Sequence, residues 1–204
     1  MSAEAPLVVI VEDDVVLRRV VSRALSGAGM ETASFDSVEA FWNAWDPSRP
    51  VGCVVADLRL PGDSGLSLQP EFSERGIGTP IVFMTGYGDV ETAVHAMKGG
   101  AVDFLEKPFV EAQLLAAVNR AIESERNARR DRETRMAVDE RVARLTPREK
   151  EVMDLLATDL STKEVASRLE ISPRTVEVHR QRILHKMEVE SLAALVRFLL
   201  QPEA

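Results

Sequence analysis

The chain has 204 residues and a formal net charge of −8, with 45% hydrophobic and 28% charged residues. This length allows two small domains with a core each, and the composition is that of an ordinary globular protein. No apolar run approaches the roughly 18 residues of a membrane span, and the N-terminus lacks the basic stretch of a signal peptide, so we expect a cytoplasmic protein with no membrane partner.

Residues 5–122 form the first predicted domain, because short apolar runs alternate there with longer segments of helical period. This alternation is typical of an α/β fold, and we expect a doubly wound, five-stranded parallel sheet with strand order 2-1-3-4-5. The single cysteine, Cys53, lies in the third run and is expected in the core. The predicted strands are Leu7–Val11, Glu31–Phe35, Val51–Ala56, Ile81–Met84 and Ala101–Glu106, and the predicted helices span 15–26, 38–45, 65–74, 89–98 and 110–122.

Residues 123–143 are predicted to be a charged linker, since the segment has almost no apolar side chains before Met136. Opposite charges three or four positions apart, such as Glu125 and Arg129, favour a helix that continues the fifth helix of the first domain.

Residues 144–204 are predicted to be a small all-α domain of four helices that contains a helix-turn-helix. Two capping boxes, at Thr146 with Glu149 and at Ser161 with Glu164, mark helix starts, and Ser172 precedes a proline at the first position of another helix. The helices at 162–169 and 173–187 would form the helix-turn-helix, and the last helix would span Leu192–Leu200.

The negative charge is concentrated in the first domain, whereas the helix at 173–187 is basic. It carries Arg174, Arg180, Arg182 and Lys186 against Glu177 alone. Val176, Ile183 and Met187 recur at helical spacing and should face the core. The charged face could simply be solvated, but it could also bind nucleic-acid phosphates.

Polar residues follow four of the five predicted strands: Glu12 and Asp13, Asp57, Thr85, and Lys107. In an open parallel sheet the carboxyl ends of the strands form the ligand crevice, and order 2-1-3-4-5 would bring three carboxylates together there. Such carboxylates repel one another unless a cation neutralises them, and an all-oxygen set suits Mg²⁺. An ionised Asp57 beside Mg²⁺ and Lys107 could attack a phosphoryl group, and Thr85 could then hydrogen-bond the acyl phosphate.

The motifs VEDD, CVVADLRLPGDSG, IVFMTG and VDFLEKPF resemble the bacterial receiver domain over residues 7–122. The resemblance implies that Asp57 is the phosphoacceptor. It also implies that Asp13, Asp57 and the backbone carbonyl of Arg59 bind Mg²⁺, with Glu12 acting through water, and that Lys107 precedes a cis Pro108.

The same resemblance implies a switch made by Thr85 and Phe104. The hydroxyl of Thr85 would move toward the phosphate and the ring of Phe104 would turn inward, while Gly86 leaves space for the movement. From the sequence alone, Phe104 would be read as a static core residue.

The stretch from about residue 144 to 200, including SPRTVEVHRQRILHKM, is similar to the LuxR-type DNA-binding domain, and the whole chain resembles the FixJ/NarL group of two-component response regulators. The resemblance implies that 173–187 is the recognition helix, and it distributes the DNA contacts. Those nearest the bases would be Glu177, Val178 and Gln181, and those toward the backbone would be Lys163, Arg174, Thr175, Arg180 and Lys186.

Two departures from that family concern turns where glycine is frequent, because Asp159 and Glu170 stand there. Glutamate tolerates the left-handed conformation less well than glycine, so we expect a differently shaped turn before the recognition helix.

The expected function is therefore transcription control rather than enzymatic turnover. A sensor histidine kinase would phosphorylate Asp57, the receivers would form a homodimer, and the dimer would bind double-stranded DNA, with RNA polymerase as a further partner. The receiver would catalyse only its own Mg²⁺-dependent phosphorylation and dephosphorylation.

Two alternatives remain open. A phosphotransfer enzyme or phosphatase could use the aspartyl site for turnover, although Leu58 and Arg59 after Asp57 do not match the Asp-x-Asp pattern of haloacid-type enzymes. Alternatively, the helical tail of a receiver protein could bind RNA or another protein.

Overall fold

The computed structural model describes residues 5–62, 64–86, 96–158 and 160–199. It divides into two compact units between Asn127 and Ala128, inside helix α5 (Glu111–Ala143), and each unit is described by itself. The domain limits 5–122, 123–143 and 144–204 stay predictions, although the division falls within the predicted linker. No helix in the described part of the chain is long and apolar enough to span a membrane.

The first unit contains the predicted parallel sheet, and the predicted order β2-β1-β3-β4-β5 is confirmed. Its middle strands are apolar up to their carboxyl ends, because both faces of the sheet are covered. Fully burying a valine or leucine side chain contributes about 1.5–3 kcal/mol, so these runs belong in the interior. The strands are β1 (Leu7–Val11), β2 (Glu31–Phe35), β3 (Val51–Asp57), β4 (Ile81–Thr85) and β5 (Asp103–Glu106).

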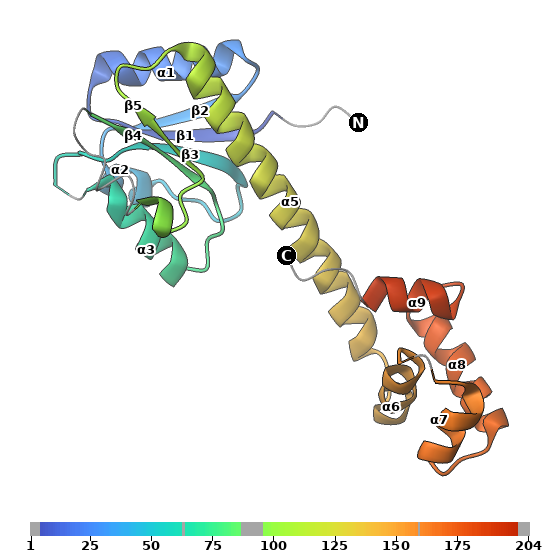
Figure 1. The fold of residues 1–204 in the computed structure, drawn as a ribbon. Helices are drawn as coiled ribbons and strands as arrows, with labels where there is room; N and C mark the ends of the chain where they lie inside the picture. Colours follow the sequence, from blue (N-terminus) through green and yellow to red (C-terminus); the bar gives the residue numbers. More distant parts are fainter. Residues whose placement is uncertain (1–4, 63, 87–95, 159, 200–204) are drawn as a thin grey trace. The chain divides into compact units, whose positions relative to one another are not determined.

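Helices cover both faces of this sheet (Figure 1). The helix α1 (Val15–Gly27) and the first part of α5 cover one face, through residues such as Leu25 and Val118. The other face is covered by α2 (Val38–Asn43) and α3 (Leu68–Glu74), through Phe41 and Phe72. Cys53 is buried between strands, as expected, and burial raises the pKa of its thiol.

The predicted helix at 65–74 is divided in the structure. Residues Gly65–Ser67 form a 3₁₀ turn, and α3 begins only at Leu68. Pro70 explains the difference, because it has no N–H to donate and its ring would clash with the carbonyl group four residues earlier in a continuous α-helix. Most of the helix predicted at 89–98 lies outside the described residues; residues 96–98 are helical.

Helix α5 continues through the predicted linker and ends at Ala143. Its first turns are anchored by buried residues, the last of which is Ile122, and beyond them the side chains are largely exposed. Arg129 donates to Glu133 one turn later at 2.9 Å, the kind of charge pairing that favours a solvated helix.

The second unit contains α6 (Pro147–Leu156), α7 (Thr162–Arg168), α8 (Pro173–Lys186) and α9 (Leu192–Leu199). Both predicted capping boxes are present, and Ser172 accepts a hydrogen bond from the backbone of Thr175 as the cap of α8. The helices surround one apolar core. Val176 and Ile183 of α8, and Met187 directly after this helix, are fully buried in it, as predicted.

The turn between α7 and α8 corrects one expectation. Glu170 adopts the left-handed conformation, with φ at 53°, so the turn keeps the shape that glycine would allow. The amides of Glu170 and Ile171 donate to the carbonyls of Ser167 and Ala166, which is the Schellman pattern at a helix end. These hydrogen bonds offset the strain in Glu170. The other departure, Asp159, lies outside the described residues.

Candidate functional site

Three carboxylates meet at the carboxyl edge of the sheet. Glu12 and Asp13 follow β1, and Asp57 ends β3, which pairs directly with β1. One oxygen from each carboxylate can be chosen so that the three lie within 4.8 Å of one another. Glu12 and Asp57 are 1% and 7% exposed, whereas Asp13 is exposed. The strand pairing therefore produces the crowded acidic pocket that the sequence predicted.

Lys107 reaches this pocket from the end of β5. Its ammonium donates to Asp57 Oδ2 at 2.6 Å and to Glu12 Oε2 at 2.8 Å. Burial alone would lower the pKa of Lys107, but the hydrogen bonds to Asp57 and Glu12 outweigh burial and raise that pKa. The Lys107–Pro108 peptide is cis, as the resemblance implied, and the backbone amide of Lys107 donates to the carbonyl of Thr85 at 2.7 Å.

The electrostatics of the pocket suit a bound divalent cation. Burial raises the pKa of Glu12, and the nearby charge of Asp57 acts in the same direction against the opposing effect of Lys107. Lys107 contacts two of the three carboxylates and Arg18 donates to the backbone carbonyl of Asp13 at 3.1 Å, so hard oxygen ligands remain available to a cation. Glu12, Asp13 and Asp57 fit the predicted Mg²⁺ site, while the carbonyl of Arg59 as a ligand stays a prediction.

The neighbouring Asp14 has a separate role. Its side chain accepts hydrogen bonds from the amides of Val16 at 2.7 Å and Leu17 at 3.0 Å, so it caps α1. These hydrogen bonds to the charged carboxylate lower the pKa of Asp14. Of the three acids after β1, only Glu12 and Asp13 belong to the acidic cluster.

Sequence reasoning missed Gly65, which makes close backbone packing behind Asp57 possible. A Cβ atom at Gly65 would lie 1.9 Å from the carbonyl oxygen of Asp57, so any other residue would force the backbone to shift. The adjacent Ser64 hydroxyl donates to the carbonyl of Leu58 at 2.8 Å, and the amide of Arg59 donates to Asp57 Oδ1 at 3.0 Å. The signal in the sequence was the GDSG segment shortly after the phosphoacceptor candidate.

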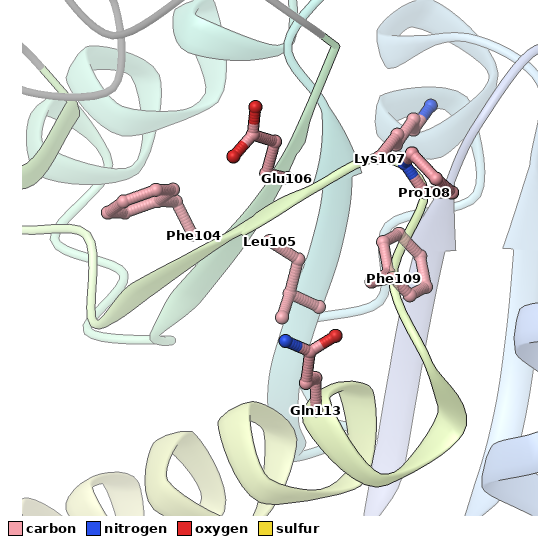
Figure 2. Close-up of a pocket in the computed structure, with 7 residues that line it drawn as sticks. All are labelled: Phe104, Leu105, Glu106, Lys107, Pro108, Phe109 and Gln113. Carbon is pink, nitrogen blue, oxygen red and sulfur yellow. The ribbon is translucent and has the colours of Figure 1, made fainter.

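The predicted switch pair lies on β4 and β5. Thr85 is buried beside the pocket and its hydroxyl donates to the carbonyl of Gly86 at 3.3 Å. Among the described residues, no atom lies within 4 Å of a Cβ placed on Gly86. Phe104 is 44% exposed, and Figure 2 shows its ring on the same side of β5 as Glu106, with Leu105 on the other. Residues 104–109 and Gln113 line a pocket of about 410 Å³.

The candidate DNA-reading surface is one face of α8. Arg174, Glu177, Val178 and Gln181 follow the i, i+3, i+4, i+7 spacing of a single helix face, and all four are exposed. Val178 is 42% exposed, which is unusual for an apolar residue with a core close by. The buried residues of α8 lie on a different face, so this stripe is available to a partner.

The other predicted DNA contacts have varied surroundings. Lys163 is exposed on α7, and the Thr175 hydroxyl lies 2.7 Å from that of Ser172. Arg180 is half-buried and lies 3.5 Å from Glu177. Lys186 donates to the buried Glu149 at 2.6 Å, so it has a partner within its own unit. The assignment of these residues to DNA stays a prediction.

Two family models match the chain. Residues 8–119 match the response regulator receiver domain, and residues 143–199 match the bacterial regulatory proteins of the luxR family. Together they cover most of the sequence, including both candidate surfaces.

Individual relatives match over nearly the whole length. The transcriptional regulatory protein FixJ of Bradyrhizobium diazoefficiens is 41% identical over 94% of this chain and 93% of that protein. The transcriptional regulatory protein TdiR of Thauera aromatica is 36% identical over 98% of this chain and 88% of that protein. The solved structure of the response regulator StyR is 38% identical and covers 98% of this chain and 100% of its own, with a TM-score of 0.84.

Proposed function

Because the chain belongs to the family of bacterial response regulators with a LuxR-type DNA-binding domain, and is thus a two-component transcriptional regulator, we propose that phosphorylation of Asp57 controls its binding to operator DNA. A sensor histidine kinase supplies the phosphoryl group. The observation that supports this most directly is the contact of Lys107 with both Asp57 and Glu12 in one acidic pocket.

The transfer step uses a carboxylate oxygen of Asp57 as the nucleophile. The new bond forms between that oxygen and phosphorus, the P–N bond of the kinase phosphohistidine breaks, and the imidazole leaves. Lys107 neutralises one side of the group in transfer, and the backbone amide of Arg59 orients the carboxylate. Asp13, Asp57 and the Arg59 carbonyl, with Glu12 through water, would hold Mg²⁺, which would supply further positive charge to the group in transfer.

Phosphorylation then acts through Thr85 and Phe104. Thr85 hydrogen-bonds the phosphate, and the ring of Phe104, exposed in this structure, turns inward and reshapes the surface formed by β5 and the segment before it. Two receivers pair through that surface. Moving such an equilibrium from mostly inactive to mostly active requires a preference of roughly 5.5 kcal/mol, which a charged hydrogen-bond network around a phosphate could provide.

Dimerisation controls DNA binding because one copy presents few positive charges. Two recognition helices would double the phosphate contacts and read half-sites about one helical turn apart. Glu177, Val178 and Gln181 would touch base edges, while Lys163, Arg174, Thr175, Arg180 and Lys186 lie toward the backbone. A regulator bound at a promoter would contact RNA polymerase. Because bacterial DNA lies in the cytoplasm, we expect the protein to act there.

The decisive experiment compares the wild-type chain with Asp57→Asn, using Asp139→Asn on exposed α5 as the matched control. Labelled acetyl phosphate with Mg²⁺ should label the wild type and the control but not Asp57→Asn. Sedimentation should show that labelling increases dimerisation, and gel shifts should show tighter binding to duplex DNA than to RNA.

Each rival function predicts a different result. Continuous hydrolysis of the phosphodonor, with no dimerisation in sedimentation and no change in DNA affinity, would favour an enzyme. Preferential binding of RNA would favour the other alternative. Labelling of Asp57→Asn would move the phosphoacceptor to another residue.

A further inference from the structure

Glu188, just after the recognition helix, is an unexpected residue for its position. It adopts the left-handed conformation, with φ at 55°, where glycine is the usual residue. It also puts a negative charge at the C-terminal end of α8, where the helix dipole is already negative. The amides of Glu188 and Val189 donate to the carbonyls of His185 and Leu184, so the Schellman pattern accommodates the backbone conformation, but it gives the carboxylate of Glu188 no partner.

The compensation comes from Arg141 in the last turn of α5 and from Arg144 directly after that helix. Arg141 lies 3.1 Å from one carboxylate oxygen of Glu188, and Arg144 donates to the other oxygen at 2.9 Å. Both arginines are distant in sequence from Glu188, so only the packing of α5 against the end of α8 brings them together. Within this pairing, the charge of Glu188 becomes favourable.

Arg141 makes two more contacts at the same place. Its guanidinium donates to the carbonyl of Met187, which caps the end of α8, at 3.2 Å. It also lies over the ring of Phe198 on α9, 4.8 Å from the ring centroid. One half-buried arginine thus joins the ends of α5 and α8 to α9.

We propose that Arg141 and Arg144 are positioning residues for DNA recognition, which hold the recognition helix at its C-terminal end through Glu188 and the Met187 carbonyl. The inference rests on the proposed DNA binding and deepens it. The part of the protein that recognises DNA then includes the end of α5. The orientation of α8 depends on the contact of Arg141 and Arg144 with the end of α8, and not on the helix-turn-helix alone.

Glu188→Gly separates this role from local helix stability. Glycine suits the left-handed position and removes the unfavourable charge, so local preferences predict a helix end at least as stable. The positioning role predicts the opposite for function: about a five- to tenfold loss of affinity for a duplex selected from a random pool by the phosphorylated wild-type full chain. Glu170→Gly, in the equivalent turn of α7, is the matched control and should keep that affinity.

A double-mutant cycle supplies the second test. Arg144→Ala should weaken binding of the selected duplex in the wild-type background but have little further effect in Glu188→Gly, because both changes remove the same contact. The slope of affinity against salt should stay unchanged. If Arg144→Ala weakens binding equally in both backgrounds and lowers the slope by about 0.9, Arg144 binds phosphate directly and the proposal is overturned.

Amide hydrogen exchange on the full chain tests, without DNA, whether Arg141 and Arg144 stabilise the end of α8. The combined change Arg141→Ala with Arg144→Ala should speed exchange of the Met187 and Val189 amides, whereas Arg129→Ala, elsewhere on α5, should not. Unchanged exchange would overturn the inference even if the wild type selected a duplex. Failure of the wild type to select any duplex, with the exchange effect present, would instead contradict only the proposed DNA binding.

Discussion

The ammonium of Lys186 donates a 2.6 Å hydrogen bond to Glu149 Oε2, which joins the end of α8 to the first turn of α6. Glu149 is 3% exposed, and the same oxygen also accepts from the backbone amide of Thr146 at 2.8 Å, so the buried carboxylate has two donors. Lys186, which the resemblance assigns to the DNA backbone, thus also forms a structural contact within the second unit.

This pair predicts how the second unit responds to acid. The hydrogen bond from Lys186, followed by that from the Thr146 amide, lowers the pKa of Glu149 to about 2. Because the folded-state pKa is depressed, its stabilisation is present above the unfolded value near 4.5 and is lost as pH falls toward 2. Glu149→Gln should therefore lose on the order of 2–3 kcal/mol at pH 7 and flatten the pH dependence below pH 4.5.

Circular dichroism of the full chain at several pH values measures this effect. Tryptophan fluorescence separates the units, because both tryptophans, Trp42 and Trp45, lie in the first unit. The fluorescence transition should be the same in the variant. An acid transition of the second unit that does not change in Glu149→Gln would contradict the prediction.

Magnesium should stabilise the first unit through Asp13. At about ten times its dissociation constant, a ligand that binds only the folded state adds about 1.4 kcal/mol. We therefore expect Mg²⁺ to raise the fluorescence-detected Tm of the wild type, and Asp13→Asn to remove most of that increase. Asp14→Asn is the matched control, since asparagine can still cap α1 and Asp14 lies outside the carboxylate cluster. Equal responses in the two variants would exclude Asp13 as a ligand.

Gly65→Ala should destabilise the first unit by about 2–3 kcal/mol, because the added methyl group would overlap the Asp57 carbonyl and displace the loop. Gly27→Ala, where nothing lies within 4 Å, should instead stabilise α1 by about 0.5–1 kcal/mol. Denaturant unfolding followed by fluorescence compares the two. A tolerated alanine at position 65 would mean that the backbone behind Asp57 adjusts freely.

Glu170→Gly should stabilise the second unit by about 0.5–1 kcal/mol, because it relieves a left-handed glutamate while keeping the Schellman hydrogen bonds. Glu190→Gly serves as the comparison, since Glu190 does not have positive φ and glycine there only increases the entropy of the unfolded chain. Thermal unfolding followed by circular dichroism should give opposite signs for the two changes. A loss of stability in Glu170→Gly would mean that its side chain makes a stabilising contact.

Substitutions in the recognition helix should affect either the sequence specificity or the overall affinity of DNA binding, depending on the residue. Gln181→Ala should cost about 1–3 kcal/mol at one base pair and relax the preference there. Arg174→Ala should weaken binding to all sequences and lower the salt slope by about 0.9. Arg23→Ala, an equal loss of charge on the exposed side of α1 in the first unit, is the control. Binding to single-substitution duplexes at several salt concentrations would reveal the pattern; a uniform effect of Gln181→Ala would remove it from base reading.

The sequence alone was enough to predict the buried strands, the helix starts and the residues of the acidic site. Apolar runs marked the buried strands and capping boxes marked the starts of α6 and α7, while the expected strand order and the resemblance to receiver domains predicted that Asp13, Asp57 and Lys107 converge. The strands and helix starts follow from backbone periodicity and from hydrogen bonds between residues a few positions apart, whereas the convergence of the three site residues also required the strand order.

Only the tertiary structure decided which partners distant side chains have. The pairing of Lys186 with Glu149, the clamp of Arg141 on Glu188 and the space that Gly65 leaves behind Asp57 depend on how helices and loops pack. A lysine on a basic helix has the same local pattern whether it faces DNA or a buried carboxylate. In this fold, packing gives Lys186 a buried carboxylate as a partner, because an unpaired charge on the buried Glu149 would be too costly; contact of Lys186 with DNA stays a prediction.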